Sequence, residues 1–216
     1  MLFLIKKEYV RFIKKFLQNG KLLHSTSYFY KKVMSQAVVI TPVKDSPGTS
    51  ENTIKSVCNS EGDFDYYVFN DFSQSETKQI LEKAREIYGF NLIHLEDITD
   101  RPSPNYKLVL EMAQKISIEN RLPLIIVESD VIVKKDTFLN LLKLNEIKPS
   151  PGLIGAITTD KEGNYNFPYN FEKTKSPEVI KTKRSLSFCC TLLSLQFLES
   201  TDFKNLSPKK HWFDLT

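Results

Sequence analysis

Acidic side chains follow each of four apolar segments in the first 130 residues, and their placement could support chemistry. If these segments are parallel strands, their carboxyl ends meet at one edge of a sheet, where open α/β sheets bind ligands. The sequence therefore predicts one acidic edge. The residues that follow the segments in order are Thr41, Pro42, Val43, Lys44 and Asp45; Asn70 and Asp71; Glu96, Asp97, Asp100 and Arg101; and Glu128, Ser129 and Asp130.

The Glu128-Ser129-Asp130 triplet follows the most apolar of these segments, residues 122–127. Positions i and i+2 of an extended backbone point to the same face, so we expect Glu128 and Asp130 to converge. Mg²⁺ and Mn²⁺ prefer oxygen ligands and share them with substrate phosphates, and such a metal would neutralise a diphosphate leaving group. The alternative is a pair of ordinary strand-end acids that cap the next helix.

Apolar strand-like segments alternate with helical patterns from residue 37 onward. This alternation predicts an α/β domain with a mainly parallel sheet flanked by helices. The continuous apolar run LPLIIV predicts a central strand covered on both faces. Strands are predicted at 37–43, 65–70, 91–95, 122–127 and 152–158, and helices at 51–60, 75–88, 105–118 and 135–144. Later, residues 160–169 are predicted to form a hairpin or loop, 172–184 a polar loop, and 186–195 a strand running into a helix.

The net charge of +4 is unevenly distributed along the chain. Residues 1–35 hold eight basic side chains and one acid, which gives 8 − 1 = +7, so the remainder carries 4 − 7 = −3. A mildly acidic main domain argues against a nucleic-acid-binding surface. Residues 2–17 space their apolar side chains as a basic amphipathic helix does. Such an arm either contacts an anionic membrane surface or packs against its own domain or a partner.

Several other classes of protein are disfavoured by missing features. No apolar run approaches the roughly 20 residues that span a bilayer, and no secretory signal is recognisable. The sequence lacks a P-loop, a G-x-G-x-x-G turn and a G-x-S-x-G elbow, and its three histidines lack zinc-ligand spacing. Its three cysteines form no C-x-x-C pair, which fits a reducing cytoplasm.

Four segments in order resemble the family-2 glycosyltransferases of the GT-A fold. VVITPVKDS resembles the opening strand and its turn, and YYVFNDFSQSE resembles the I-V-V-D-D-G-S-T-D segment. RPSPNYKLVLEMA resembles the arginine-led helix that precedes the metal strand, and LPLIIVESDV resembles the strand that leads to the D-x-D motif. The likeness covers residues 37–216, so we expect an arm at 1–35, a GT-A-like domain at 36–216, and a natural protein that continues further.

The resemblance implies roles for individual residues of the acidic edge. Thr41, Val43 and Asp45 would line the nucleoside pocket, with Pro42 shaping the turn. Asp71 would accept a hydrogen bond from the base, and Arg101 would lie near the base or the diphosphate. Asp130 would be the principal ligand of Mg²⁺ or Mn²⁺, and Glu128 an auxiliary one. Asp214 would be the catalytic base, although a single acid stands there where the family usually has two.

The function implied is transfer of a sugar from a nucleotide-diphosphate sugar to a glycan or lipid-linked acceptor. The expected reaction is metal-dependent and inverting, with the enzyme in the cytoplasm or peripheral at the inner face of the membrane. One alternative is an inactive GT-A domain that binds nucleotide-sugar or acts as a scaffold. Another is a sugar-phosphate nucleotidyltransferase, for which Lys44 and Gly48 are a weak match to the expected Gly-rich, basic phosphate-binding loop.

Overall fold

The computed structural model describes residues 35–147, 152–165, 179 and 186–203. The chain divides into two units, with the boundary between Ser35 and Gln36. The predicted amphipathic arm lies outside the described residues, Ser35 excepted, and Asp214 also lies outside them. Both therefore stay predictions, and the description below concerns the second unit.

A six-stranded sheet in the order β3-β2-β1-β4-β6-β5 forms the centre of this unit. Four neighbouring strands are parallel, and β6 runs antiparallel to β4 and to β5. This is the mainly parallel α/β sheet that the sequence predicts. The strands are β1 (Ala37–Val43), β2 (Phe64–Asn70), β3 (Asn91–His94), β4 (Leu124–Val127), β5 (Leu153–Gly155) and β6 (Cys190–Leu193).

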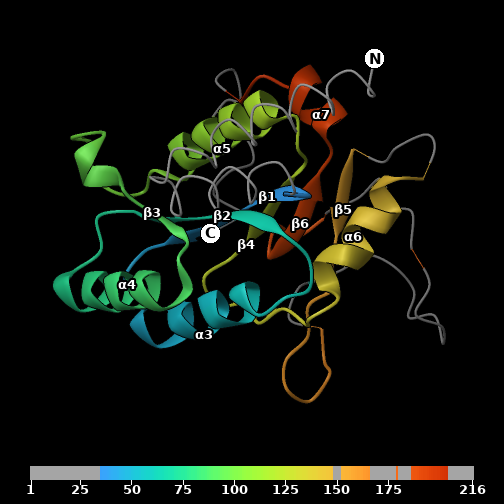
Figure 1. Cartoon of the computed structure of the whole chain (residues 1–216). Coiled ribbons are helices and arrows are strands. Elements are labelled where there is room, and N and C mark those ends of the chain that lie inside the picture. Colours follow the sequence, from blue (N-terminus) through green and yellow to red (C-terminus); the bar gives the residue numbers. More distant parts are fainter. Residues whose placement is uncertain (1–34, 148–151, 166–178, 180–185, 204–216) are drawn as a thin grey trace, which may run out of the picture. The chain divides into compact units, whose positions relative to one another are not determined.

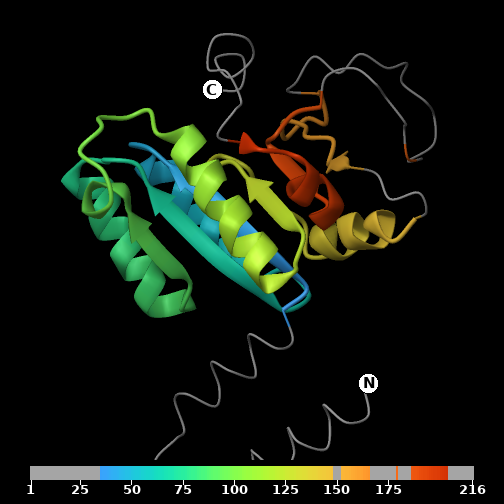
Figure 2. The ribbon, with the colours of Figure 1, turned by 90° about the horizontal axis from the view of Figure 1, so that it is seen from above.

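Helices cover both faces of the sheet, with α5 on one face and α3 and α4 on the other (Figures 1 and 2). The residues packed against each face show that α7 joins α5, whereas α6 joins α3 and α4. The helices are α3 (Pro47–Cys58), α4 (Ser75–Tyr88), the short 3₁₀ helix η1 (Leu95–Asp97), α5 (Tyr106–Asn120), α6 (Thr137–Asn145) and α7 (Leu195–Ser200).

Local sequence explains where two of these helices begin and end. α4 spans the residues that the sequence predicts, and Gly89 ends it at a φ of 71°, a left-handed conformation that glycine adopts without strain. α3 begins at Pro47, four residues earlier than predicted. Proline suits the first helical turn, because its missing N–H would have no helical partner there and its φ is already helical.

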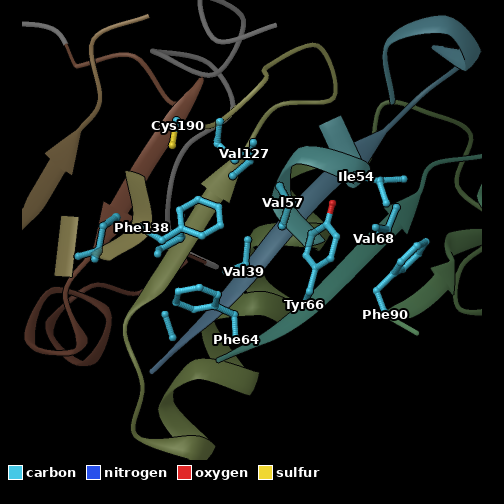
Figure 3. Close-up of a cluster of buried hydrophobic side chains, with 14 of the residues drawn as sticks. Val39, Ile54, Val57, Phe64, Tyr66, Val68, Phe90, Val127, Phe138 and Cys190 are labelled. Carbon is cyan, nitrogen blue, oxygen red and sulfur yellow. The ribbon is translucent and has the colours of Figure 1, made fainter. Parts of the chain in front are cut away.

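Two apolar clusters, one on each face, bury the sheet. All four residues of β4 are buried, as expected for a strand covered on both sides. Val39, Tyr66 and Val127 belong to the cluster under α3, α4 and α6 (Figure 3). The alternation of strand side chains therefore decides which residues reach the α5 face at the strand ends.

The region after residue 150 departs most from prediction. β5 is shorter than the predicted strand at 152–158. In the segment 186–195, predicted as a strand running into a helix, β6 begins at Cys190 and α7 begins at Leu195. A single bridge joins Thr159 and Tyr165 in the predicted hairpin. Residues 166–178 and 180–185, which include most of the predicted polar loop, lie outside the described residues.

Among the helices of the described segments, none combines the length and the apolar character needed to cross a membrane.

The central position of β1 can be tested by truncating Ile40, whose side chain is fully buried. We expect Ile40→Ala to lower the free energy of unfolding by about 2–5 kcal/mol, because it removes buried methyl groups and leaves a cavity. The matched control is Ile87→Ala on α4, where the side chain is 72% exposed and the expected change is within about 0.5 kcal/mol. Urea unfolding measures both, and equal effects would contradict the burial of Ile40 between the two faces of the sheet.

Candidate functional site

Three loops meet at the edge where β1, β2 and β4 end, because parallel pairing aligns the carboxyl ends of these strands. The pairing joins Val43 of β1 to Asn70 of β2, and Ile40 of β1 to Ile126 of β4. Hydrogen bonds then connect the loops to one another. Ser46 Oγ, in the loop after β1, donates to Ser129 Oγ, after β4, at 3.2 Å.

The loops after β1 and β2 are joined through Asp45. Its backbone N–H donates to Ser73 Oγ at 3.0 Å, and its Oδ1 accepts from the N–H of Gln74 at 2.7 Å. This backbone hydrogen bond and a neighbouring hydrogen bond with Lys44 lower the pKa of the Asp45 carboxyl group. Asp45 thus sits at the predicted edge, where its carboxylate ties down the residues that precede α4.

Two non-glycine residues at these strand ends adopt left-handed backbone conformations. The φ angle is 43° at Asp45 and 55° at Phe72. A bulky residue in this region carries a cost of roughly 1–2 kcal/mol, which the surrounding contacts must offset. The Phe72 side chain packs partly against the apolar cluster under α5, and its backbone oxygen accepts from Lys44 Nζ. Backbone strain is therefore held at the edge where the candidate site lies.

The Asp71 carboxylate accepts three hydrogen bonds from the segment that leads into α5. Oδ2 accepts from Ser103 Oγ at 2.7 Å and from the backbone N–H of Asn105 at 2.8 Å. Oδ1 accepts from Asn105 Nδ2 at 2.7 Å. Asp71 is 7% exposed and Asn105 is 6% exposed, so these bonds are shielded from water. An ionised carboxylate has about four acceptor positions, so one remains for the predicted contact with a base.

Glu128 and Asp130 follow β4 in different environments. Glu128 is half-buried, and its Oε1 accepts from the Tyr106 hydroxyl of α5 at 3.0 Å. The pKa of Glu128 is raised to about 7, mainly by burial; the Tyr106 hydrogen bond lowers it and the nearby charge of Asp130 raises it. Asp130 is exposed. The backbone turns at Ser129 and Asp130, and the Val131 N–H donates to Glu128 O at 3.1 Å, so the extended conformation expected for this triplet is wrong.

The remaining predicted nucleoside residues lie near this edge but face different ways. Thr41 is buried, and its Oγ1 accepts from the Tyr66 hydroxyl at 2.9 Å, on the α3 and α4 side. Figure 3 shows Tyr66 on that side, near Ile54 and Val57. Val43 packs in the same cluster. Any contact of Thr41 or Val43 with a ligand would thus have to come from the backbone.

Pro42 and Arg101 differ from these two. Pro42 is half-buried, and the alternation along β1 directs it to the α5 face. The Arg101 side chain is exposed, while its backbone oxygen accepts from Asn105 Nδ2 at 3.1 Å. Arg101 therefore lies in the segment that Asp71 holds, whereas Pro42 lies on the sheet face that α5 covers.

The residues present fit a divalent cation only as a partial ligand set. Among the described residues, no group of three or more His, Cys, Asp or Glu side chains could hold a metal ion. Two carboxylates lie close together, one exposed and one half-buried, and their mutual repulsion would be relieved by a cation. Mg²⁺ and Mn²⁺ usually keep water and phosphate oxygens as further ligands, so two carboxylates suffice when a diphosphate is also bound.

Sequence reasoning missed three residues that organise this edge: Ser103, Asn105 and Tyr106. Asn105 is the N-cap of α5, a position that asparagine favours, so its place before a helix was detectable. Its partner Asp71 lies 34 residues away, and Tyr106 lies 22 residues from Glu128. No local pattern reveals such contacts.

A second missed feature is a polar chain on the other face of β2. Asn70 Nδ2 lies 2.8 Å from His94 Nδ1, and His94 Nε2 lies 3.0 Å from Glu82 Oε1 on α4. The Oδ1 of Asn70 accepts from the Ser73 N–H at 3.3 Å, so the Asn70 Nδ2 donates to His94 Nδ1. His94 then donates its Nε2–H to Glu82 Oε1. These hydrogen bonds stabilise the loop after β2 from the side of the sheet that α4 covers.

Comparison with known families identifies the class of domain to which this fold belongs. The model of glycosyl transferase family 2 matches residues 38–201. The chain therefore belongs to glycosyl transferase family 2, with the GT-A fold that the sequence predicts. No curated protein gives a significant match.

Two solved structures of S. aureus TarS show the same fold. S. aureus TarS 1–349 in complex with UDP aligns with a TM-score of 0.58 at 19% identity, over 76% of this chain and 48% of that chain. A second crystal structure of TarS 1–349 aligns with a TM-score of 0.57 at 19% identity and the same coverage. The Pyrobaculum calidifontis mannosyltransferase PcManGT aligns with a TM-score of 0.46 at 15% identity, over 58% of this chain and 36% of that chain. This chain thus spans less than half the length of these proteins.

The environment of Glu128 predicts a specific pH dependence of stability in metal-free buffer. Its folded-state pKa of about 7 lies above its ordinary 4.5, so the folded protein holds this proton more tightly than the unfolded chain. That contribution is complete below pH 4.5 and is lost as pH rises through about 7. We expect Glu128→Gln, which keeps an acceptor for Tyr106, to match wild type at about pH 4 and exceed it by roughly 1–3 kcal/mol at pH 8.

Chemical unfolding in EDTA across this pH range measures the difference. Asp130→Asn serves as the companion variant, because removing that charge lowers the folded-state pKa of Glu128, so that less stability is lost and the loss ends at a lower pH. Parallel pH profiles for wild type and Glu128→Gln would contradict the assigned environment of Glu128.

Proposed function

We propose that this chain supplies the donor-binding part of a glycosyltransferase that uses a nucleotide-diphosphate sugar. The observation that carries the proposal is the arrangement at the edge of β1, β2 and β4. The Asp71 carboxylate, which is shielded from water, retains one acceptor position there. Two further carboxylates, Glu128 and Asp130, follow β4, on the other side of β1 from Asp71. Membership of glycosyl transferase family 2 supports the same reaction class.

Each part of the edge would act on a different part of the donor. Asp71 would accept a hydrogen bond from the base, and Pro42 and Asp45 would border the nucleoside. The exposed Arg101 side chain would reach the base or the diphosphate. Asp130, with Glu128 as an auxiliary ligand, would hold Mg²⁺ or Mn²⁺, which when bound neutralises charge on the diphosphate leaving group.

The reaction proposed is a one-step displacement. The acceptor hydroxyl oxygen forms a bond to the anomeric carbon while the bond from that carbon to the nucleotide diphosphate breaks, and the anomeric configuration inverts. A general base takes the hydroxyl proton as the bond forms. Asp214 is our candidate for that base, on the resemblance alone, and the acceptor proposed is a glycan or a lipid-linked sugar.

Donor binding can be tested by thermal shift with UDP, GDP, CDP and dTDP, each with and without Mn²⁺. UDP is the first probe, since the TarS structure that shares this fold holds UDP. At a nucleotide concentration 100 times Kd we expect about 2.7 kcal/mol of added stability, or roughly 5–10 °C, with Mn²⁺ present. Asp130→Asn should remove the metal-dependent part of this shift.

The matched control is Glu119→Gln, which removes an exposed acid at the far end of α5 and should leave the shift unchanged. If none of the four nucleotides stabilises the protein in a metal-dependent way, the proposal fails. It also fails if Glu119→Gln and Asp130→Asn behave alike.

A nucleotide-sugar binding module without turnover is the second candidate. The observation that favours it is the state of Glu128, which is half-buried and held by Tyr106, so that only Asp130 is exposed to a metal. Release of free nucleotide from donor and acceptor separates the two candidates. For an active enzyme, Asp214→Ala should abolish turnover and leave nucleotide binding intact; binding without turnover in the wild-type chain supports the module.

We further propose that residues 1–35 hold the protein at an anionic membrane surface on the cytoplasmic side. Their charge of +7 supports this, since each basic residue near such a surface contributes about 1 kcal/mol. Deleting 1–35 should abolish sedimentation with phosphatidylserine vesicles, and replacing Arg11, Lys14 and Lys15 together with alanine should weaken it strongly. Binding that survives the deletion would refute the proposal and favour an arm that packs on protein.

A further inference from the structure

The first turn of α5 connects two parts of the candidate site that cannot touch directly. Asp71 follows β2 and Glu128 follows β4, and β1 lies between these strands. Neighbouring strands are about 4.8 Å apart, so the two strand ends are separated by roughly 10 Å. Asn105 bonds to Asp71, and the next residue, Tyr106, bonds to Glu128. Two consecutive residues therefore bridge the end of β1.

The Asp71 end of this bridge is rigid. Asn105 uses its backbone N–H and its Nδ2 on different oxygens of one carboxylate, which fixes both the position and the plane of that group. Ser103 Oγ adds a third bond to the same carboxylate. Hydrogen bonds to an ionised, shielded carboxylate are stronger than those between neutral groups, so the start of α5 is tied to the end of β2.

At the Glu128 end of the bridge, the hydroxyl of Tyr106 donates to Glu128 Oε1 at 3.0 Å. The Tyr106 ring packs against the apolar cluster under α5, so the hydroxyl cannot follow Glu128 freely. Any ligand that draws the Glu128 carboxylate toward itself acts on the first turn of α5. Any ligand that moves Asp71 acts on the same turn from the other side.

We propose that Asn105 and Tyr106 are positioning residues that couple the base-binding carboxylate Asp71 to the metal-binding carboxylate Glu128. Nucleotide bound at Asp71 then fixes Glu128 for the metal, and metal bound at Glu128 fixes Asp71 for the base. Thermodynamic linkage makes the two effects equal. The inference rests on the proposed function, because it needs both ligands to bind at this edge.

The test measures, for each variant, the ligand affinity of the carboxylate that the replaced side chain does not contact. The Asn105 side chain donates to Asp71 and to the backbone oxygen of Arg101, yet we expect Asn105→Ala to weaken Mn²⁺ binding to the UDP complex about fivefold. Tyr106→Phe should weaken metal-free UDP binding by a similar factor, although its hydroxyl contacts Glu128. Electron paramagnetic resonance of free Mn²⁺ measures the first Kd, and calorimetry with UDP in EDTA measures the second.

Matched controls separate coupling from a general loss of stability. Tyr66→Phe also removes one buried hydroxyl bond, of 2.9 Å, but on the opposite face of the sheet. Asn120→Ala removes an asparagine bond of 2.9 Å at the far end of α5. Both should leave the two Kd values unchanged within twofold when measured well below the unfolding temperature. A merely structural role would lower stability in all four variants and change neither Kd.

The outcomes are distinguishable. If wild type binds UDP with Mn²⁺ but Asn105→Ala and Tyr106→Phe keep both Kd values within twofold, the coupling is refuted and the proposed function stands. If wild type binds no nucleotide with Mn²⁺, both fail. Where Asn105→Ala does not fold, Ser103→Ala replaces it, because it removes only one of the three bonds to Asp71; an unchanged Mn²⁺ Kd in that variant likewise refutes the coupling.

Discussion

The parallel pairing of β1 with β2 and β4 is the constraint on which the rest of the site depends. Each of these strands buries side chains on both faces, so polar side chains are available to a ligand only at the strand ends. Parallel pairing then brings those ends to one edge. The loops there are held by the Asp45, Asp71 and Ser46 hydrogen bonds, which join residues far apart in sequence. The core thereby determines where chemistry is possible.

The alternation of side chains along each strand divides the polar residues between the two faces. The side chains of Thr41 and Asn70 form hydrogen bonds on the side of α3 and α4, with Tyr66 and His94, and so stabilise the ends of β1 and β2. Asp71 and Glu128 bond to residues at the start of α5. The start of one helix, α5, thus contacts two of the four carboxylates proposed to bind the donor and its metal. The strained backbone at Asp45 and Phe72 lies beside it, where stored strain is common in functional sites.

Much of the fold was predictable because its signals are local. The apolar LIIV run and the Gly89 stop identify β4 and α4 without reference to the rest of the chain. The site was predictable only in outline. The turn at Ser129 and Asp130 replaces the expected extended backbone, and the partners of Asp71 lie 32 to 34 residues away. Contacts of that kind depend on tertiary packing, which no spacing rule in one sequence encodes.

The central claim is that a metal–nucleotide complex binds at the carboxyl edge of the sheet, on the α5 side. Paramagnetic broadening of amide signals by Mn²⁺ with UDP, compared with Mg²⁺ and UDP, locates the metal directly. We predict broadening centred on Phe72, Ser129 and Val131, with Gln36, Asp63 and Arg121 at the opposite edge unaffected. Broadening centred on that opposite edge, or spread evenly over the domain, would contradict the claim.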